Sequence, residues 1–229
     1  MKLAIMQPYL FPYIGYWQLI NAVDTFVIYD DVNFIKKGYI NRNSILSNGK
    51  AQLFTLELIS ASQNKLINDI EVGNNRTKIL AIIEQNYKKA PYFNEVFTML
   101  KDILKNDEKN LAKFIGYSLE LISKYLDIDT NFIYSSSLEK DNTLKGQEKI
   151  LEISKLLNAN KYINAIGGKE LYDKYIFKKL NIELNFLETH IVEYKQFKDD
   201  FIPYLAIIDI LMFNSTDESK NMLNLYKLT

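Results

Sequence analysis

The spacing of apolar residues changes several times along this chain. In the N-terminal part it changes from a pattern typical of a strand to one typical of a helix and back. Residues 2–6 form a short apolar run that ends at Gln7-Pro8, which is typical of a buried strand. Residues 13–23 carry apolar side chains at helical spacing, and residues 25–29 are β-branched and aromatic, which indicates a second strand. Because a helix connects the two strands, we expect a parallel pair with a right-handed crossover.

Turn residues divide the rest of the chain into a hairpin and a series of further elements. The turn Ser47-Asn48-Gly49 lies between apolar residues 39–46 and 51–58, which predicts a β-hairpin. Further strands are expected at residues 67–72, 131–134, 161–166 and 182–187. Helices are expected at residues 77–89, 92–104, 110–126, 144–157, 169–180, 205–213 and 216–228.

Strands that alternate with helices at both ends of the chain predict an α/β fold. We expect a Rossmann-like parallel sheet with a β-hairpin and a helical insert at about residues 76–128. The chain has 229 residues, a length that suits a single domain over 1–229. Hydrophobic residues make up 48% and charged residues 24% of it, which favours a folded core over disorder.

Composition excludes several classes of protein and of site. Lys plus Arg and Asp plus Glu both number 28, so the chain lacks the basic excess of a nucleic-acid binder. It has no cysteine and one histidine, His190, which excludes disulfides, zinc–thiolate sites and multi-histidine metal sites; we expect no metal. The apolar start is short and contains Pro8 and Pro12, and no apolar run reaches the length of a membrane-spanning helix. These features predict a cytoplasmic protein.

The first candidate site is the segment at residues 7–16, between the first strand and the first helix. Open parallel sheets bind ligands at the carboxyl ends of their strands, and a helix amino end favours an anion. Gln7 and Pro8 are therefore candidate substrate-binding residues, and Gly15 allows a close approach to the first helical turn. The alternative is an aromatic plug over the edge of the sheet.

The second and third candidates follow the second strand. Asp30 and Asp31 are acids at its end that suit a ribose hydroxyl, an amine or a cation, with a helix cap or a solvated turn as the alternative. A basic and amide-bearing loop next to the hairpin is a candidate phosphate clamp, unless its side chains are simply exposed. Its candidate substrate-binding residues are Lys36, Lys37, Asn41 and Arg42.

Three further positions carry weaker signals. Gly167 and Gly168 form a second phosphate-capable turn between a strand and a helix, although many such turns contain glycine. Asp209 lies in an apolar helix, where it needs a partner if it is buried, or else it lies on the polar edge of that helix. His190 follows a strand, and a surface or structural role is favoured for it because no triad is evident nearby.

Several blocks of the sequence resemble one known family. They are MKLAIMQPYLFPYIGYWQLINAVDTFVIYDDVNFIKKGYINRNSI, SASQNKLINDIEV, YINAIGGKELYD and YKQFKDDFIPYLAIIDILMFNS, and they span nearly the whole chain. These blocks resemble the WbqC-like proteins. The resemblance implies a place in bacterial O-antigen or other surface-polysaccharide synthesis, with transfer of an aminoacyl group such as glycine to a sugar or sugar nucleotide.

A more distant resemblance concerns the loop before the first helix. The order of strand, loop, helix and strand is similar to that of nucleotidyltransferase-like proteins with an HxGH loop, in which two histidines flank a glycine and stabilise phosphates. The matching positions here are Tyr13, Gly15 and Tyr16. Because tyrosine donates a hydrogen bond but does not carry the charge of imidazolium, nucleotide binding survives this change more easily than adenylyl transfer.

These observations lead to two functional hypotheses. In the transferase hypothesis, Asp30 is the catalytic base, Tyr13 and Tyr16 are hydrogen-bond donors to the reacting group, and the basic loop holds the diphosphate of a sugar nucleotide. The activating cofactor is open, with ATP or another nucleotide as the candidate. In the second hypothesis the chain is a non-catalytic nucleotide- or sugar-binding assembly protein of the same pathway. The aromatic loop is alternatively a dimer interface, so the oligomeric state stays open.

Overall fold

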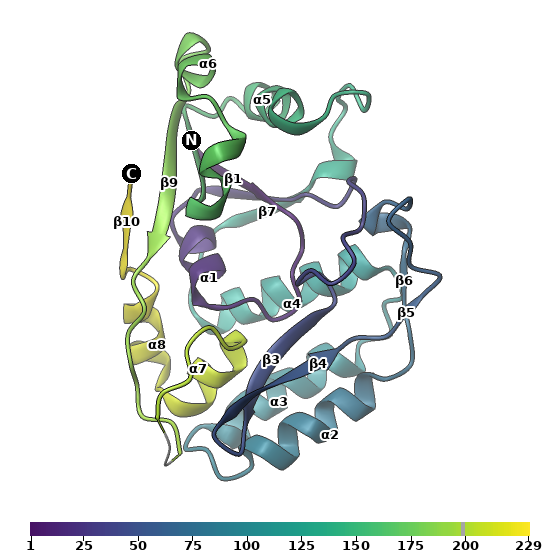
Figure 1. Ribbon diagram of the computed structural model, residues 1–229, viewed down its shortest axis with the longest axis vertical. Coiled ribbons are helices and arrows are strands. Elements are labelled where there is room, and N and C mark those ends of the chain that lie inside the picture. Colours follow the sequence, from purple (N-terminus) through teal and green to yellow (C-terminus); the bar gives the residue numbers. More distant parts are fainter. Residues whose placement is uncertain (198–199) are drawn as a thin grey trace.

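The computed structural model describes residues 1–197 and 200–229, and it contains a central sheet of six strands (Figure 1). Lys198 and Asp199, which belong to the last block of family resemblance, lie outside the described residues. The strands of the sheet are β1 (Lys2–Met6), β2 (Thr25–Ile28), β7 (Asn131–Tyr134), β8 (Lys161–Ala165), β9 (Glu183–Thr189) and β10 (Tyr226–Leu228).

The spatial order of the strands is β7-β2-β1-β8-β9-β10, and all neighbours are parallel except β9 and β10. Counted along the chain, this is the doubly wound order 3-2-1-4-5-6 of Rossmann-like folds. The predicted α/β class and Rossmann-like sheet are therefore confirmed. The direction of winding reverses between β1 and β8, so the carboxyl end of β1 lies at the position where such folds bind ligands.

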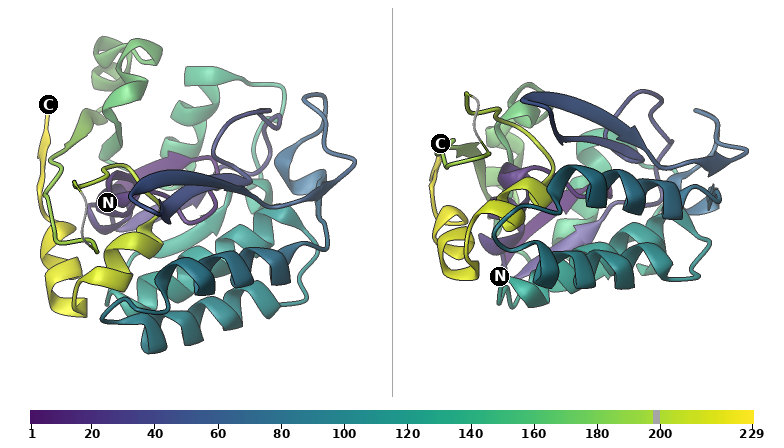
Figure 2. Two further views of the ribbon diagram at one scale, coloured as in Figure 1. Left: turned by 60° about the horizontal axis from the view of Figure 1, so that its bottom comes forward. Right: turned by 90° about the horizontal axis from the view of Figure 1, so that it is seen from below.

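Alternate residues of the central strands point into two separate cores. Ala4 and Phe26 pack with α1 (Ile14–Asn21), whereas Leu3, Ile5 and Val27 pack with α5 (Gly146–Leu156) on the opposite face. Two further views show these layers on the two sides of the sheet (Figure 2). This alternation has the period of two that buries both faces of a parallel sheet. The helices of the second layer are α5 (Gly146–Leu156) and α6 (Lys174–Lys179).

The middle of the chain contains the predicted hairpin and helices. Strands β3 (Arg42–Ser47) and β4 (Lys50–Thr55) pair around Asn48-Gly49, where both residues have positive φ, as a tight hairpin turn requires. The helices that follow are α2 (Arg76–Tyr87), α3 (Phe93–Lys105) and α4 (Leu111–Tyr125). Gly116 in α4 leaves room for the Tyr134 hydroxyl, which lies 2.0 Å from the position that a Cβ at residue 116 takes. This contact places α4 directly against the edge strand β7.

Three sequence predictions are only partly correct, because each predicted element is two elements in the structure. The strand expected at 67–72 is the 3₁₀ turn η1 (Ile67–Asp69) followed by β6 (Glu71–Val72), which pairs with β5 (Leu58–Ile59). Ile67 and Ile70 are both fully buried, a spacing of three that suits a turn and not a strand.

The other two concern helices near the C-terminal end. The helix expected at 169–180 is η3 (Ile166–Leu171) followed by α6, because the Asp173 carboxylate caps the Tyr175 N–H and begins a new helix there. The helix expected at 216–228 is α8 (Thr216–Met222) followed by β10, whose residues pair with β9. Pairing with a distant strand outweighs the local helical pattern in that segment.

One remaining helix, α7 (Ile207–Phe213), lies between the described loop after β9 and α8. Within the part of the chain that the structure describes, the helices are too short or too polar to cross a bilayer.

Candidate functional site

The loop at residues 7–13, between β1 and α1, is held by the side chains of the helix that it precedes. The Tyr16 hydroxyl donates to the Gln7 carbonyl oxygen at 2.8 Å, and the Trp17 Nε1 donates to the Pro12 carbonyl oxygen at 3.0 Å. Tyr16 is 3% exposed and packs on Phe26 in the sheet. The hydroxyl of Tyr16 is therefore used within the fold, and burial raises its pKa well above the ordinary value.

Gly15 is needed because two side chains occupy the space beside it. A Cβ at this position lies 2.3 Å from Thr189 Oγ1 and 2.5 Å from the Tyr13 hydroxyl oxygen. Burial raises the pKa of Tyr13, and a hydrogen bond with Thr189 opposes part of that shift. The Tyr13 hydroxyl is thus a neutral group at physiological pH, held beside the carboxyl end of β9.

The structure brings the first and third candidate segments together. The Asn43 amide nitrogen donates to the Leu10 and Phe11 carbonyl oxygens at 3.1 and 2.8 Å, and the Leu10 N–H donates to the Tyr39 carbonyl oxygen. Phe11 is fully buried and has a φ of 46°, a left-handed conformation that is unfavourable for a bulky residue. Asn43 therefore holds the loop between β1 and α1 in a strained conformation through its two hydrogen bonds.

An aromatic hollow of about 240 Å³ opens where these segments meet; we call it the tyrosine hollow. Tyr39 and Tyr204 form part of its lining, although they are 61% and 67% exposed, and the Tyr13 and Tyr204 rings lie 6.3 Å apart. Large aromatic side chains with this exposure offer their faces to a ligand. The lining residues are Tyr9, Pro12, Tyr13, Tyr39, Asn43 and Tyr204.

Only two of the four residues of the predicted phosphate clamp have side chains that are free of hydrogen bonds to the described backbone. Arg42 donates through Nε to the Gly38 carbonyl oxygen at 3.0 Å and through a terminal nitrogen to the Lys37 carbonyl oxygen. Asn41 exchanges hydrogen bonds with Leu56, so it closes the base of the hairpin. The side chains of Lys36 and Lys37 are exposed. Arg42 and Asn41 therefore shape the loop, and the two lysines are its accessible cations.

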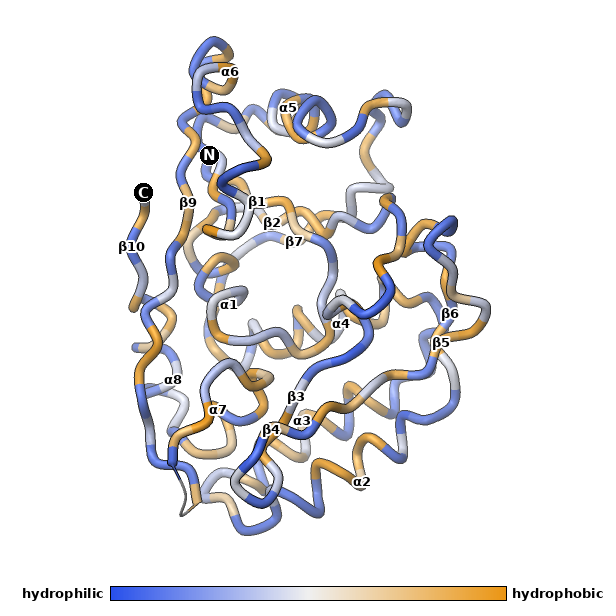
Figure 3. Tube along the Cα trace, in the orientation of Figure 1, coloured by the Kyte–Doolittle hydropathy of each residue, from blue (hydrophilic) through white to orange (hydrophobic). Residues whose placement is uncertain are grey.

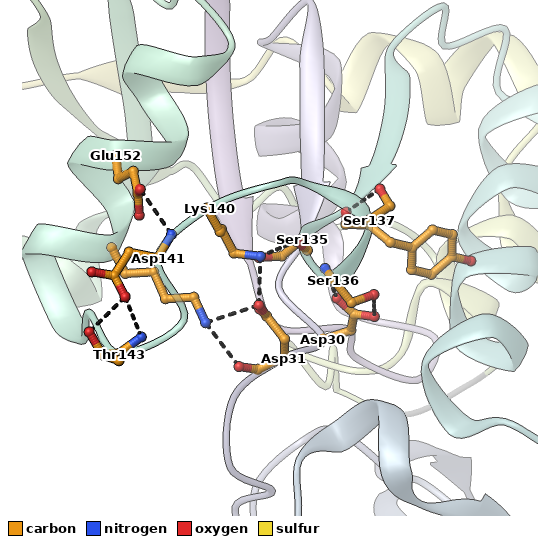
Figure 4. Close-up of polar contacts among 11 residues, drawn as sticks. Asp30, Asp31, Ser135, Ser136, Ser137, Lys140, Asp141, Thr143 and Glu152 are labelled. Carbon is orange, nitrogen blue, oxygen red and sulfur yellow. Dashed lines mark hydrogen bonds and ion pairs between the residues drawn. The ribbon is translucent and has the colours of Figure 1, made fainter.

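Asp30 lies at the end of β2 and accepts two hydrogen bonds from Ser136, the second residue after β7. The Ser136 N–H and hydroxyl lie 2.9 and 2.6 Å from its two carboxylate oxygens (Figure 4). Burial raises the pKa of Asp30, and the two hydrogen bonds from Ser136 oppose that shift. The side chain is 2% exposed, so the structure gives Asp30 an internal partner that locks the carboxyl end of β2 to that of β7.

Asp31 forms a nearly buried ion cluster with two lysines that the sequence reasoning missed. Its Oδ2 lies 2.8 Å from the Lys140 ammonium and 3.0 Å from that of Lys149, which also donates to the Asp31 carbonyl oxygen (Figure 4). Burial opposes the charge of Asp31, but the two lysines outweigh it and lower the pKa of the carboxyl. No local signal pairs these residues, because 109 and 118 positions separate each lysine from Asp31 along the chain.

The glycine pair after β8 lies outside the tyrosine hollow. Gly167 is exposed in η3, and open space surrounds the position of its missing Cβ. The position of a Cβ at Gly168 lies 3.0 Å from the Asn164 amide nitrogen. Among the residues described, Gly167 and Gly168 do not line the hollow. Gln7 and Pro8 begin the loop between β1 and α1 but are not among the lining residues either, and Pro8 is buried.

His190 follows β9 and lines a narrow hollow that shares Tyr13 and Tyr204 with the tyrosine hollow. Its backbone N–H donates to the Leu225 carbonyl oxygen, which fixes its position next to β10. A surface or structural role was predicted for His190, and nothing in the sequence singled out its neighbours Thr189 and Tyr204. The only local signal for Tyr204 was its place in a block of family resemblance.

Asp209 is fully buried and accepts hydrogen bonds from three side chains. Tyr87 donates to Oδ1 at 2.7 Å, and Tyr194 and Gln196 donate to Oδ2 at 2.6 and 2.7 Å. Gln196 also exchanges hydrogen bonds with the backbone of Ile202. Of the two alternatives that the sequence left open, the structure shows the buried carboxylate with partners. Through Gln196, the Asp209 carboxylate also fixes the backbone at Ile202, two residues before Tyr204.

We predict that Gly15→Ala lowers the free energy of unfolding by about 1–3 kcal/mol, because the new methyl group overlaps Thr189 and Tyr13. Urea unfolding measures this change. The control is Gly167→Ala, which meets open space and is expected to leave stability within about 0.5 kcal/mol of the original. Equal stability of the two variants contradicts the close packing described for Gly15.

A second prediction concerns the pKa of Asp209. Burial raises this pKa, and the three hydrogen bonds to the carboxylate oppose part of the shift. Because the folded-state pKa exceeds the unfolded value, the carboxyl contributes stability that is fully present below the unfolded pKa of 3.8. That contribution is lost as pH rises through the folded-state pKa. Asp209→Asn removes this titration and, at neutral pH, leaves a donor facing the Gln196 amide at a cost of about 1–3 kcal/mol.

Urea unfolding of the original chain and Asp209→Asn across the acidic range measures both effects. We expect the stability difference in favour of the original chain to decrease as pH rises. The control is Asp129→Asn, because Asp129 is exposed. A difference that increases with pH, or an Asp209→Asn variant as stable as the control, contradicts this assignment.

The described residues contain no group of three or more His, Cys, Asp or Glu side chains placed to hold a metal ion.

Comparison with known proteins identifies the family of the chain. The model of the WbqC-like protein family matches residues 7–221. The chain is 28% identical over 227 residues to the uncharacterized protein Rv1507c of Mycobacterium tuberculosis, a match that covers 97% of each chain. No solved structure matches. Because the family model covers most of its length, including the loop of the tyrosine hollow and Asp209, the chain belongs to the WbqC-like protein family.

Proposed function

We propose that this protein binds a sugar, or the sugar end of a sugar nucleotide, in the tyrosine hollow. The observation that carries the proposal is the gathering of four tyrosines around one hollow, beyond the carboxyl end of β1 at the start of α1. In the bacterial pathway that the resemblance implies, the ligand is an intermediate of O-antigen or other surface-polysaccharide synthesis. The position agrees with the ligand crevice of doubly wound sheets.

The chemistry of the lining suits a sugar ring. Aromatic faces pack against the C–H faces of a sugar, and phenolic hydroxyls donate to and accept from its hydroxyl groups. Burial raises the pKa of Tyr9 as well as that of Tyr13, so both hydroxyls stay protonated through the neutral range. The Asn43 amide nitrogen donates to the loop backbone, so Asn43 has a structural role in the lining. Recognition of the sugar is then the task of the tyrosines.

The size of the hollow favours the sugar over the nucleotide. Its volume of about 240 Å³ lies below the roughly 300–1,000 Å³ of typical pockets for larger ligands. A nucleoside diphosphate therefore extends out of the hollow, where the exposed Lys36 and Lys37 supply positive charge. The N-terminus of α1 has no side-chain cap at Tyr13, and the positive end of the helix dipole also favours an anion.

Aminoacyl transfer, with glycine as the simplest group, is the second candidate function. The observation that favours it is the placement of His190 and Tyr13 around one narrow hollow beside the sugar site. In this reaction an amine of the sugar attacks an activated carboxyl carbon, a C–N bond forms, and the bond from that carbon to the leaving group breaks. The amine proton passes to a base, and ATP or another nucleotide activates the carboxyl.

The geometry changes the roles that the sequence assigned to individual residues. Asp30 and Tyr16 have internal partners, so of the three predicted catalytic residues only Tyr13 lines the hollow. We assign the base to His190, because an imidazole nitrogen accepts a proton readily in general base catalysis. Tyr13 is assigned to hydrogen bonding with the carbonyl oxygen. Thr189 positions the Tyr13 hydroxyl.

We predict that Tyr39→Ala and Tyr204→Ala each weaken sugar-nucleotide binding about three- to tenfold, the equivalent of one aromatic contact of roughly 0.5–1.5 kcal/mol. Isothermal titration calorimetry with a panel of nucleoside diphosphate sugars, and with the free sugars, measures the dissociation constants. The control is Tyr175→Ala, because Tyr175 is 63% exposed but lies on α6. Unchanged affinity in the hollow variants, or no binding of any member of the panel, overturns the proposal.

The transferase candidate predicts a product of higher mass. Purified protein is incubated with the sugar nucleotide that binds, with glycine, and with ATP or charged tRNA, and mass spectrometry detects a glycyl adduct. We expect His190→Gln to reduce the rate at least 100-fold while changing the dissociation constant of the sugar nucleotide less than threefold. No adduct with any donor, from a protein that binds the sugar nucleotide, rejects aminoacyl transfer and retains the binding function.

A further inference from the structure

The segment at residues 166–179, which contains η3 and α6, exposes an unusual concentration of apolar side chains; we call it the basic-apolar segment. Leu171 and Tyr175 are 70% and 63% exposed, and Ile166 and Ile176 are 38% and 37% exposed. Leu171 is the most exposed of the large apolar residues that the structure describes. Helix α6 lies at one end of the molecule, at the top of the view in Figure 1. A tube coloured by hydropathy shows hydrophobic and hydrophilic residues side by side there (Figure 3).

The exposure does not result from a loosely attached segment. Phe177 is fully buried, and its ring stacks on Tyr162 of β8 with 5.5 Å between centroids and 7° between planes. The Asp173 N–H donates to Gln147 Oε1 of α5 at 2.6 Å, and the Asp173 carboxylate caps α6. The segment is therefore well packed on the protein through Phe177, while Leu171 and Tyr175 remain exposed. Exposure of their apolar surface to water is unfavourable in free energy.

The charge of the segment indicates what covers these side chains. It contains four lysines and two acids, a net charge of +2 in a chain whose formal net charge is zero. All four lysines are exposed, and Lys179 lies over the Tyr175 ring at 4.4 Å from its centroid. Leucine, isoleucine and tyrosine flanked by lysines are the composition with which proteins enter the interface of an anionic bilayer. The lysines are Lys169, Lys174, Lys178 and Lys179.

We infer that the basic-apolar segment docks the protein reversibly on a membrane surface that carries anionic lipids. Leu171, Tyr175 and Ile176 enter the boundary between headgroups and acyl chains, and the lysines contact lipid phosphates. The described helices do not span a bilayer, so this contact is peripheral and depends on salt. The inference does not depend on the function proposed for the tyrosine hollow.

Co-sedimentation of the full chain with vesicles tests this inference. We expect binding to vesicles of phosphatidylcholine with about 30% phosphatidylglycerol, little binding to phosphatidylcholine alone, and release as NaCl rises from roughly 0.05 to 0.5 M. Leu171→Ser/Tyr175→Ser is expected to reduce the partition coefficient at least fivefold. Lys169→Gln/Lys178→Gln is expected to reduce it roughly fivefold for each lysine removed.

Matched control variants carry the same changes elsewhere on the surface. They are Leu53→Ser/Ile59→Ser, at residues 53% and 48% exposed, and Lys113→Gln/Lys124→Gln on α4. Thermal unfolding verifies that every variant is folded. The inference is overturned if the chain does not bind anionic vesicles, if it binds both vesicle types equally, or if the controls reduce binding as much as the segment variants. A concentration-dependent dimer that Leu171→Ser/Tyr175→Ser abolishes also overturns it, because a second copy then covers the segment.

Discussion

The Asp209 carboxylate is placed among apolar side chains of α7, and an ion in that position is unfavourable unless donors surround it. Tyr87 of α2, together with Tyr194 and Gln196 from the residues after β9, satisfies this requirement. Tyr87 in turn accepts a hydrogen bond from the Leu46 N–H of β3, so the hairpin, α2 and the residues after β9 meet at a single group. The segment that contains Tyr204, a lining residue of the tyrosine hollow, is linked to Asp209 through Gln196 and Ile202.

The loop between β1 and α1 supplies another part of the lining. β1 ends where the winding of the sheet reverses, and the loop that leaves it is fixed by Asn43 from the hairpin and by Tyr16 and Trp17 from α1. The Pro12 carbonyl oxygen also accepts the Ile207 N–H at the start of α7. The hollow therefore lies between the loop that leaves β1, the start of the hairpin and the segment before α7, and its shape depends on contacts between distant segments.

The parts of the fold that follow a local pattern were predictable from the sequence. β1, α1 and β2 have clear periods, and Asn48-Gly49 marks the hairpin, so their type and approximate bounds follow from the residues alone. β10 was not predictable, because Tyr226–Leu228 forms a strand only through pairing with β9. The sequence located chemically capable groups, including Tyr13 and Asp30, but burial and partners decide their availability. Ser136 donates hydrogen bonds to the Asp30 carboxylate, and no local sequence pattern predicts a contact between residues so far apart in the chain.

The left-handed conformation of Phe11 has a consequence for the rate at which a ligand associates. A bulky residue in this region costs about 1–2 kcal/mol, and the surrounding hydrogen bonds maintain it in the unliganded protein. The loop at residues 7–13 thus has its final shape before a ligand arrives, and little chain ordering is left to the binding step. Encounter is then limited by diffusion and orientation, so differences in affinity among ligands that contact this loop appear mainly in their dissociation rates.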